Sequence, residues 1–375
     1  MIYLDNPATT RRKPLRVMAS LFYNSLVNSV NAGRGAHRFS LRGASLLASA
    51  EDEIAALFNI DTPERIVFTQ NATLALNMAI SGILSGGGHA IVTSMEHNSV
   101  LRPVHSHGNY TMVYADEYGY VSPDDIEAVI GPDTRLIVCT HASNVCGSIQ
   151  PVAQIGALAR RRGLLFLLDA AQTAGSVDIN VEEINADMVA FSGHKGLMSP
   201  LGTGGLYVGE RAELVPIISG GTGSASESLS QPDYLPDMLQ AGTMNTPAIA
   251  AMQAGAKFVR HIGTSNILAH ERALAEDFLE RICAINGVRI LGGHDMSKRN
   301  GTVAFTFNEL GSAEAAQLLD TRYGIAARGG WHCAYYAHRT LGTEASGAVR
   351  VGFGWYNTLR DSKRLSSAVR QIAAG

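Results

Sequence analysis

Residues 164–169 read Leu-Leu-Phe-Leu-Leu-Asp, an apolar run that ends on a carboxylate. A continuous apolar run without polar alternation is typical of a strand buried on both faces of a parallel sheet. A helical pattern precedes it over 153–162. The stretch therefore predicts an α/β fold in which Asp169 follows a buried strand, at the edge where open α/β sheets bind ligands.

Strand and helix patterns alternate through the first two thirds of the chain, which favours a mostly parallel central sheet. The other predicted strands cover 65–69, 90–93, 136–140, 187–191 and 205–208, and a further helix covers 73–83. We predict a large α/β domain over 13–250. The Gly/Ser-rich stretch 219–230 within it predicts a mobile loop beside the site.

After residue 247 the pattern becomes α+β, which predicts a smaller C-terminal domain over 251–375, joined by the N-terminal segment 1–12. Thr358 and Asp361 fit a capping box for a last helix that ends near Ala373. The other predicted helices and strands of this part cover 265–285, 288–291, 302–307, 312–323 and 348–353.

Composition excludes several classes of protein. The 375 residues are 46% hydrophobic and carry a net charge of −3, which supports a sizeable core and gives no footprint for nucleic acid. No signal-peptide pattern and no membrane-length apolar run is present, so we expect a soluble cytoplasmic protein. The four cysteines form no C-x-x-C pair, so neither a metal site nor a disulfide framework is expected.

Polar clusters follow the predicted strands at 71–73, 96–98, 141–144, 169–172 and 192–195. Among them, Lys195 in a Gly-flanked loop could form a Schiff base with a carbonyl cofactor, and Asp169 could keep that cofactor's ring nitrogen protonated. This pair points to pyridoxal phosphate (PLP). The alternatives are a solvated lysine and an aspartate that caps a helix.

Two further clusters suit the same cofactor. Residues 69–73, Thr-Gln-Asn-Ala-Thr, join a strand to a helix whose N-terminus could bind a phosphate, with Ser192 and His194 closing the site, or could simply form an N-cap. His97 could stack on a flat ring or relay a proton, or could be an ordinary loop histidine.

Residues 328–334 read Arg-Gly-Gly-Trp-His-Cys-Ala. Cys333 lies near an arginine and a histidine, which favours a reactive thiolate. Arg328 and Arg350 suit a substrate carboxylate. A buried structural cysteine and surface arginines are the alternatives.

These motifs together resemble the class V, fold-type I PLP enzymes, and within them the cysteine desulfurase and selenocysteine lyase group. The resemblance covers nearly the whole chain, and the form of residues 328–334 is similar to the second desulfurase subgroup, Arg-x-Gly-x-His-Cys-Ala. Pro7, in place of an expected alanine, and Trp331 depart from the family's pattern. The resemblance implies an aspartate aminotransferase-like fold, with a large PLP-binding domain and a small C-terminal domain.

The resemblance also implies roles for individual residues. Lys195, Cys333 and His97 would be catalytic, and Asn144, Arg328 and Arg350 would bind the substrate. The implied cofactor-binding residues are Ala72, Thr73, His97, Asn144, Asp169, Gln172, Ser192, His194, Lys195 and, from the second subunit of a homodimer, Thr243.

The implied reaction converts L-cysteine to L-alanine and leaves a persulfide on Cys333, from which sulfur passes to an acceptor protein or thiol. The alternatives are a selenocysteine lyase acting on L-selenocysteine and another class V aminotransferase or lyase. A cofactor-free scaffold and a His/Cys metal site are the remaining hypotheses, and the metal site lacks ligand spacing.

Overall fold

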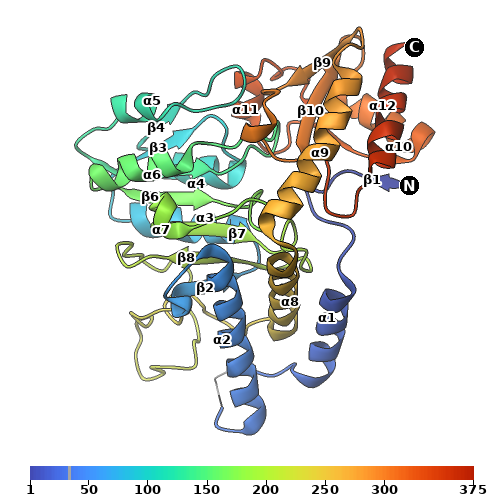
Figure 1. Cartoon of the computed structure of the whole chain (residues 1–375). Helices are drawn as coiled ribbons and strands as arrows, with labels where there is room; N and C mark the ends of the chain where they lie inside the picture. The colour runs from blue at the N-terminus through green and yellow to red at the C-terminus, as the bar shows by residue number, and fades with distance from the viewer. Residues whose placement is uncertain (33–34) are drawn as a thin grey trace.

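The structure, a computed structural model, describes residues 1–32 and 35–375. Its largest element is a seven-stranded sheet with strand order β2-β8-β7-β6-β5-β3-β4 (Figure 1). The apolar runs of the sequence predict all of these strands except β4. The strands are β2 (Ile66–Thr69), β3 (His89–Thr93), β4 (Tyr110–Val113), β5 (Thr134–Thr140), β6 (Leu165–Asp169), β7 (Met188–Ser192) and β8 (Gly204–Val208).

The prediction of a mostly parallel sheet is confirmed. β4, β3, β5, β6 and β7 run parallel, whereas β8 pairs antiparallel with both β7 and β2. Because parallel neighbours require crossover connections, the carboxyl ends of β3, β5, β6 and β7 all reach the same edge of the sheet.

Helices cover both faces of this sheet, which explains its unbroken apolar strands. Ile137 and Phe166 belong to the core on one face, and Val138 and Leu167 to the core on the other. The first face packs against α2 (Arg38–Phe58), α5 (Pro123–Ala128), α6 (Val152–Arg161), α7 (Val181–Ile184) and α8 (Thr246–Ile262), and the second against α3 (Ala72–Leu84) and α4 (Asn98–His107).

A second, antiparallel sheet of four strands lies in the C-terminal part of the chain, in the order β12-β13-β10-β9. Phe278, Phe305, Leu319 and Leu365 form a separate core between this sheet and its helices. The strands are β9 (Val288–Leu291), β10 (Thr302–Phe307), β12 (Arg328–Gly330) and β13 (Ala348–Gly352), and the helices are α9 (Thr264–Ile282), α10 (Ser312–Tyr323), α11 (Tyr335–Thr340) and α12 (Leu359–Ala373). The predicted capping box of the last helix is confirmed at Thr358 and Asp361.

The N-terminal segment lies against this second sheet before the chain enters the first. β1 (Ile2–Tyr3) pairs with β11 (Ile325–Ala326), and α1 (Leu15–Val27) then packs on α8. In Figure 1 the N-terminus accordingly lies beside α12, far from α1. The domain limits 13–250 and 251–375 stay a prediction, and residue 250 falls inside α8.

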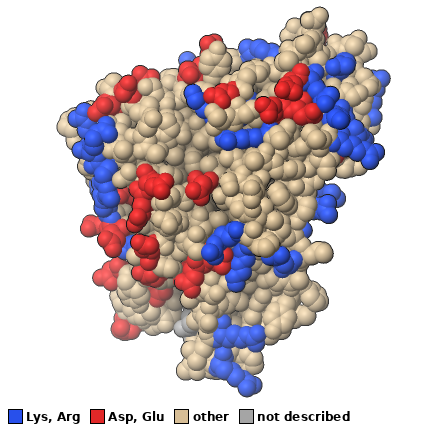
Figure 2. All heavy atoms as spheres, in the orientation of Figure 1, with Lys and Arg blue, Asp and Glu red and all other residues tan. Residues whose placement is uncertain are grey.

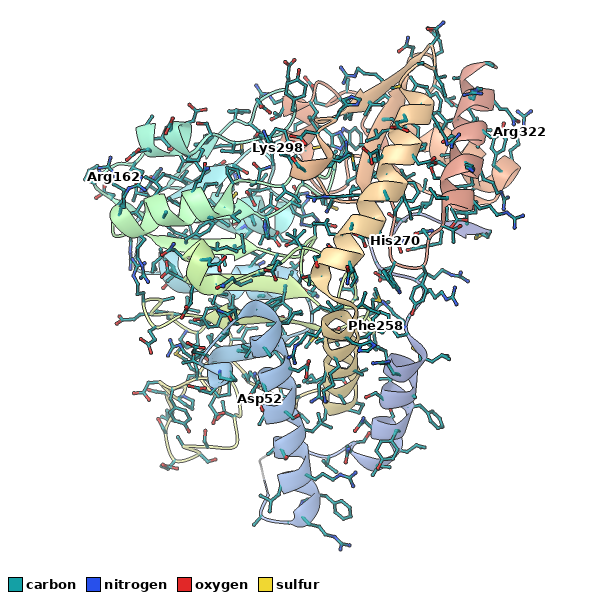
Figure 3. The ribbon with its side chains drawn as sticks, viewed as in Figure 1. Asp52, Arg162, Phe258, His270, Lys298 and Arg322 are labelled. Carbon is teal, nitrogen blue, oxygen red and sulfur yellow. The ribbon has the colours of Figure 1, made fainter. Side chains whose placement is uncertain are left out.

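Helices α8 and α9 connect the two regions through Gly263, which has a φ of 90°. Phe258 lies on α8 and His270 on α9, on either side of this junction (Figure 3). His270 Nε2 lies 3.0 Å from the carbonyl oxygen of Asn357, and its ring contacts Trp355. The junction is therefore tied to the turn that precedes α12.

The remaining segments are short or irregular. Residues 209–245 contain no helix or strand, and the Gly/Ser-rich stretch lies within them, although its mobility stays a prediction. Two 3₁₀ turns cover Pro63–Arg65 and Met296–Lys298. Within the described residues, no helix is both long and apolar enough to cross a membrane. On the face drawn in Figure 2, acidic and basic side chains are interspersed.

Candidate active site

A cavity of about 220 Å³ lies at the carboxyl ends of β3, β5, β6 and β7. It brings together all the predicted site residues except Cys333 and Thr243. The predicted residues that line it are Ala72, Thr73, His97, Asn144, Asp169, Gln172, Ser192, His194, Lys195, Arg328 and Arg350. The expectation that the strand-end clusters converge on one site is therefore confirmed by the topology of the sheet.

Asp169 and Lys195 are the two charged residues whose roles are predicted from the strand ends, and both line the cavity. Asp169 ends β6, and its Oδ1 accepts a hydrogen bond from the backbone N–H of Ala171 at 2.9 Å. Burial raises the pKa of the Asp169 carboxyl. Burial also lowers the pKa of Lys195 to about 8, while the charge of Asp169 acts in the opposite direction. The lysine is thus poised to exchange a proton near neutral pH.

The N-terminus of α3 forms another wall of the cavity. Asn71 caps the helix by accepting from Leu74 N–H at 2.9 Å, and Ala72 N–H donates to Ser192 Oγ at 3.3 Å. His194 contributes a buried Nδ1 that has no hydrogen-bond partner among the described residues. Burial lowers the pKa of His194 to about 4, so the ring is neutral. A helix N-terminus with a buried, unpaired ring nitrogen beside it suits an anion.

His97 caps the N-terminus of α4 and also lines the cavity. It precedes α4, and its Nδ1 accepts from Ser99 N–H at 3.1 Å. This bond leaves the proton on Nε2. Burial, followed by the charge of Lys195, lowers the pKa of His97 to about 4. His97 therefore presents a neutral imidazole ring to the cavity, which suits stacking on a flat aromatic group.

Gln172 and Asn144 are both held by backbone groups. Gln172 Nε2 donates to the carbonyl oxygen of Pro7 at 3.0 Å. Asn144 Nδ2 donates to the carbonyl oxygen of His332 at 2.7 Å. Pro7 itself lines the cavity. This residue, which departs from the family's pattern, is thus part of the wall through its backbone.

The two arginines reach the cavity from the smaller sheet, where Arg328 on β12 and Arg350 on β13 lie directly opposite each other. Arg350 is 1% exposed, and its Nη2 lies 2.8 Å from Asp5 Oδ1. Asp5 was given no role from the sequence because 345 residues separate the two. The only local signal was its position in the Tyr3-Leu4-Asp5-Asn6 run.

Glu96 is a second residue that sequence reasoning left without a role, although it adjoins His97. Its Oε1 accepts from Thr93 Oγ1 at 2.6 Å and from Thr140 N–H at 2.9 Å. Burial raises the pKa of Glu96 to about 8, so the carboxyl is mostly protonated at neutral pH. Thr140, whose N–H binds Glu96, lies opposite Asp169 in the pairing of β5 with β6. Glu96 and Asp169 are therefore neighbours.

Cys333 does not line the cavity but lies next to Arg328 and His332, which do, and this position is called the rim. Cys333 is exposed and follows β12, and its backbone oxygen accepts from Asn98 N–H at 2.7 Å. Arg328 Nη2 lies 3.9 Å from its Sγ, as the sequence predicted. The indole N–H of Trp331 donates to the carbonyl oxygen of Glu344.

The histidine next to Cys333 adds no positive charge beside the thiol. His332 is buried, with its Nε2 lying 3.0 Å from the carbonyl oxygen of Ala348. Burial and the neighbouring charge of Arg350 lower the pKa of His332 to about 2. The ring is therefore neutral, and Arg328 is the cation that lies beside the thiol.

Two further expectations concern residues outside the cavity. Thr243 is exposed and does not line it, so its predicted role depends on a second subunit. Within 1–32 and 35–375, no group of three or more His, Cys, Asp or Glu residues is placed to hold a metal ion.

Comparison with known proteins identifies the family. The family model described as aminotransferase class-V matches residues 2–365. The chain belongs to this family. A probable cysteine desulfurase from Methanothermobacter thermautotrophicus is 34% identical over 99% of this chain and 94% of its own. As predicted from its resemblance, this class-V aminotransferase is a PLP-dependent enzyme with an α/β fold of type I.

Solved structures agree with the fold of this class-V aminotransferase. A cysteine desulfurase from Thermococcus onnurineus NA1 superposes with a TM-score of 0.93 at 29% identity, covering 100% of this chain and 95% of that one. The cysteine desulfurase CsdA from Escherichia coli gives 0.88 at 26% identity, covering 99% and 94%.

The donor groups of the cavity fit the family's cofactor. The α3 N-terminus with the unpaired His194 Nδ1 suits the phosphate, and the buried Asp169 carboxylate suits a protonated ring nitrogen. Lys195, with its lowered pKa, suits the aldehyde. The individual contacts with the cofactor stay predictions.

Proposed function

We propose that this class-V aminotransferase is a cysteine desulfurase that converts L-cysteine to L-alanine and leaves a persulfide on Cys333. The observation that carries the proposal is an exposed thiol with a guanidinium 3.9 Å away, at the rim of a cavity built around Lys195 and Asp169. The names of relatives that match over nearly the whole chain support the same reaction.

The proposed cofactor contacts follow the walls of the cavity. Lys195 would bond the aldehyde carbon, Asp169 would pair with the ring nitrogen, Gln172 would contact the ring oxygen and His97 would stack on the ring. Asn144 lies beside the ring and also contacts the substrate. The phosphate is held by Ala72, Thr73, Ser192 and His194, with Thr243 supplied by a second copy of the chain.

When bound, the cofactor would condense reversibly with the substrate's amino group and take up the electron pair released at Cα. Asn144, Arg328 and Arg350 orient the substrate by its carboxylate. Once the amine of the substrate has displaced it from the cofactor, Lys195 would be the free base that takes the Cα proton, and its pKa of about 8 leaves a useful fraction of neutral amine near neutral pH. It is also placed to return a proton.

Cys333 performs the sulfur step. Its thiolate attacks the substrate sulfur, so that a new S–S bond forms while the bond from Cβ to sulfur breaks. The electron pair of the broken bond remains with the carbon skeleton, which takes up protons and leaves as alanine. Arg328 attracts the thiolate electrostatically, and the Cys333–Asn98 backbone bond anchors the rim beside His97.

One observation favours selenocysteine lyase as the second candidate. Cys333 does not line the cavity, and a lyase that releases selenium from L-selenocysteine does not require a nucleophilic thiol there. The two reactions therefore differ in their need for Cys333.

The test uses two exposed cysteines as a matched pair. Purified protein is incubated with L-cysteine and separately with L-selenocysteine, and alanine and the cysteine persulfide are quantified. We expect Cys333→Ala to lose alanine formation from cysteine and the persulfide, whereas Cys283→Ala, also at an exposed thiol, retains both. Unchanged alanine formation from cysteine in Cys333→Ala would rule out the desulfurase mechanism.

The proposal extends to partners and location. The exposed Cys333 is accessible to an acceptor protein or thiol, and four free cysteines fit the reducing cytoplasm.

A homodimer is supported by the apolar side chains that α1 exposes, with Leu15 88%, Phe22 68% and Leu26 71% accessible. Sedimentation of the purified protein at micromolar concentration tests the proposed homodimer, and a monomer would contradict it.

A further inference from the structure

Arg350 has an unusual set of partners. Its Nη1 donates to the carbonyl oxygen of Asn144 at 2.9 Å, and its Nη2 donates to Asp5 Oδ1 at 2.8 Å. Its Nε is buried and has no hydrogen-bond partner among the described residues. Arg350 also lines the cavity. The guanidinium is thus held on one side by two oxygens and retains donor capacity for a further ligand.

The charges around Arg350 make Asp5 more than an incidental neighbour. Arg328 lies opposite Arg350 on the adjacent strand, and like charges in that position repel each other. Burial, together with Arg328, lowers the pKa of Arg350, while Asp5 raises it. Among the described residues, Asp5 is the carboxylate paired with this buried cation.

Asp5 is itself fixed by backbone contacts to the strand that carries Arg350. It forms a β-bridge with Gly352, whose N–H donates to the carbonyl oxygen of Leu4 at 2.7 Å. Asn6 Nδ2 donates to the carbonyl oxygen of Gly352 at 2.8 Å. A carboxylate fixed in this way holds the guanidinium plane in one orientation.

The same segment continues to the lysine loop. The Pro7 carbonyl oxygen accepts from Gln172, and Thr10 Oγ1 donates to the carbonyl oxygen of Lys195 at 2.7 Å. Thr9 Oγ1 donates to the carbonyl oxygen of His194 at 3.1 Å. Residues 5–10 therefore connect the arginine of the smaller sheet with the lysine of the larger one.

We propose that Asp5 is a positioning residue that orients Arg350 for the carboxylate of an amino-acid substrate, and that residues 5–10 set the separation between this carboxylate site and Lys195. The inference rests on the proposed function for the identity of the ligand. It adds a residue that binds neither substrate nor cofactor and acts through Arg350.

The experiment separates carboxylate recognition from the rest of the reaction. The holoenzyme is titrated by calorimetry with 3-mercaptopropionate, which has a carboxylate and a thiol but no amine, and with cysteamine, which has an amine and a thiol but no carboxylate. We expect Asp5→Ala to weaken 3-mercaptopropionate binding by about tenfold, since the loss of a charged partner frees the guanidinium. Cysteamine binding and the visible absorbance of the cofactor should not change.

Two further variants keep the test decisive if Asp5→Ala folds poorly. Asp5→Asn retains an oxygen acceptor for Arg350, so its affinity for 3-mercaptopropionate should remain within about threefold of wild type. Asp5→Glu displaces the carboxylate by one methylene, so it should weaken binding and raise the KM for cysteine while kcat changes less. Asp125→Ala, at an exposed aspartate on α5, is the control.

Two results would overturn the inference. One is wild-type affinity for 3-mercaptopropionate in Asp5→Ala and Asp5→Glu. The other is an equal loss of affinity for 3-mercaptopropionate and cysteamine, which indicates a general structural role. The test also separates this inference from the proposed function. If the enzyme transfers no sulfur, Asp5→Ala should still weaken the binding of 3-mercaptopropionate selectively.

Discussion

Lys195 lies in a loop that neighbouring segments fix on several sides, whereas Cys333 lies exposed on a short connection between β12 and α11. The carbonyl oxygen of Lys195 accepts from Thr10, and its side chain lies within the cavity at the sheet edge. Cys333 has a positive φ of 58° and contacts Arg328 across 3.9 Å. In the proposed function, the first region carries the cofactor chemistry that a whole family shares, and the second selects the reaction.

The largest effect should come from the buried region. Lys195→Ala removes the amine proposed to bond the cofactor and to move the Cα proton, so activity should fall by about 10³-fold or more with every substrate. The loss of activity is measured by alanine formation, and the loss of the bond to the cofactor by its visible absorbance. Retention of activity and of the absorbance would show that the cofactor chemistry does not depend on the region around Lys195.

A smaller but still large effect is expected at Asp169. Asp169→Asn keeps the shape of the side chain but cannot keep the ring nitrogen protonated, so kcat should fall by about 10²-fold. The KM for cysteine should change little, because Asp169 is not among the residues proposed to hold the substrate. An unchanged kcat in steady-state kinetics would contradict this role.

A modest effect is expected at the rim. Arg328→Gln removes the cation beside Cys333, so the rate of Cys333 alkylation by iodoacetamide should fall by about two- to fivefold, as for other partly exposed charge pairs. The visible absorbance of the cofactor should stay the same, and Cys283 in the same sample is the control. Loss of the cofactor would show that the rim and the cofactor site are one unit.

The smallest effect on activity is expected at Glu96→Gln, which should instead change the pH dependence of stability. Burial raises the pKa of Glu96 from 4.5 to about 8. Between these values the folded protein retains a proton that the unfolded chain releases, so wild-type stability falls as pH rises through that window. Glutamine lacks this proton, so its Tm advantage over wild type should grow between pH 5 and 8. A constant Tm difference would show that Glu96 is charged in the folded protein.

The cofactor region could be predicted well because its signals are local. Apolar runs identify buried strands. Asp169 ends β6 and Lys195 lies in the loop after β7, so the parallel pairing of these strands places both residues on one edge. β4 was missed because its short segment is only partly buried at the edge of the sheet. The rim was predicted less well, since the sequence places His332 next to Cys333 but cannot show that its ring is buried and neutral.

By itself, the sequence determined the α/β class, the strand-end site, the cofactor and the candidate nucleophile. Hydrophobic periodicity suffices for the first two, whereas the cofactor and the nucleophile follow from the resemblance of the motifs to the class V PLP enzymes. Only the tertiary structure decided that Arg350 pairs with Asp5, that Glu96 holds its proton beside Asp169, and that Cys333 lies outside the cavity lining. These depend on contacts between distant segments and on burial, which set both the orientation and the charge of a side chain.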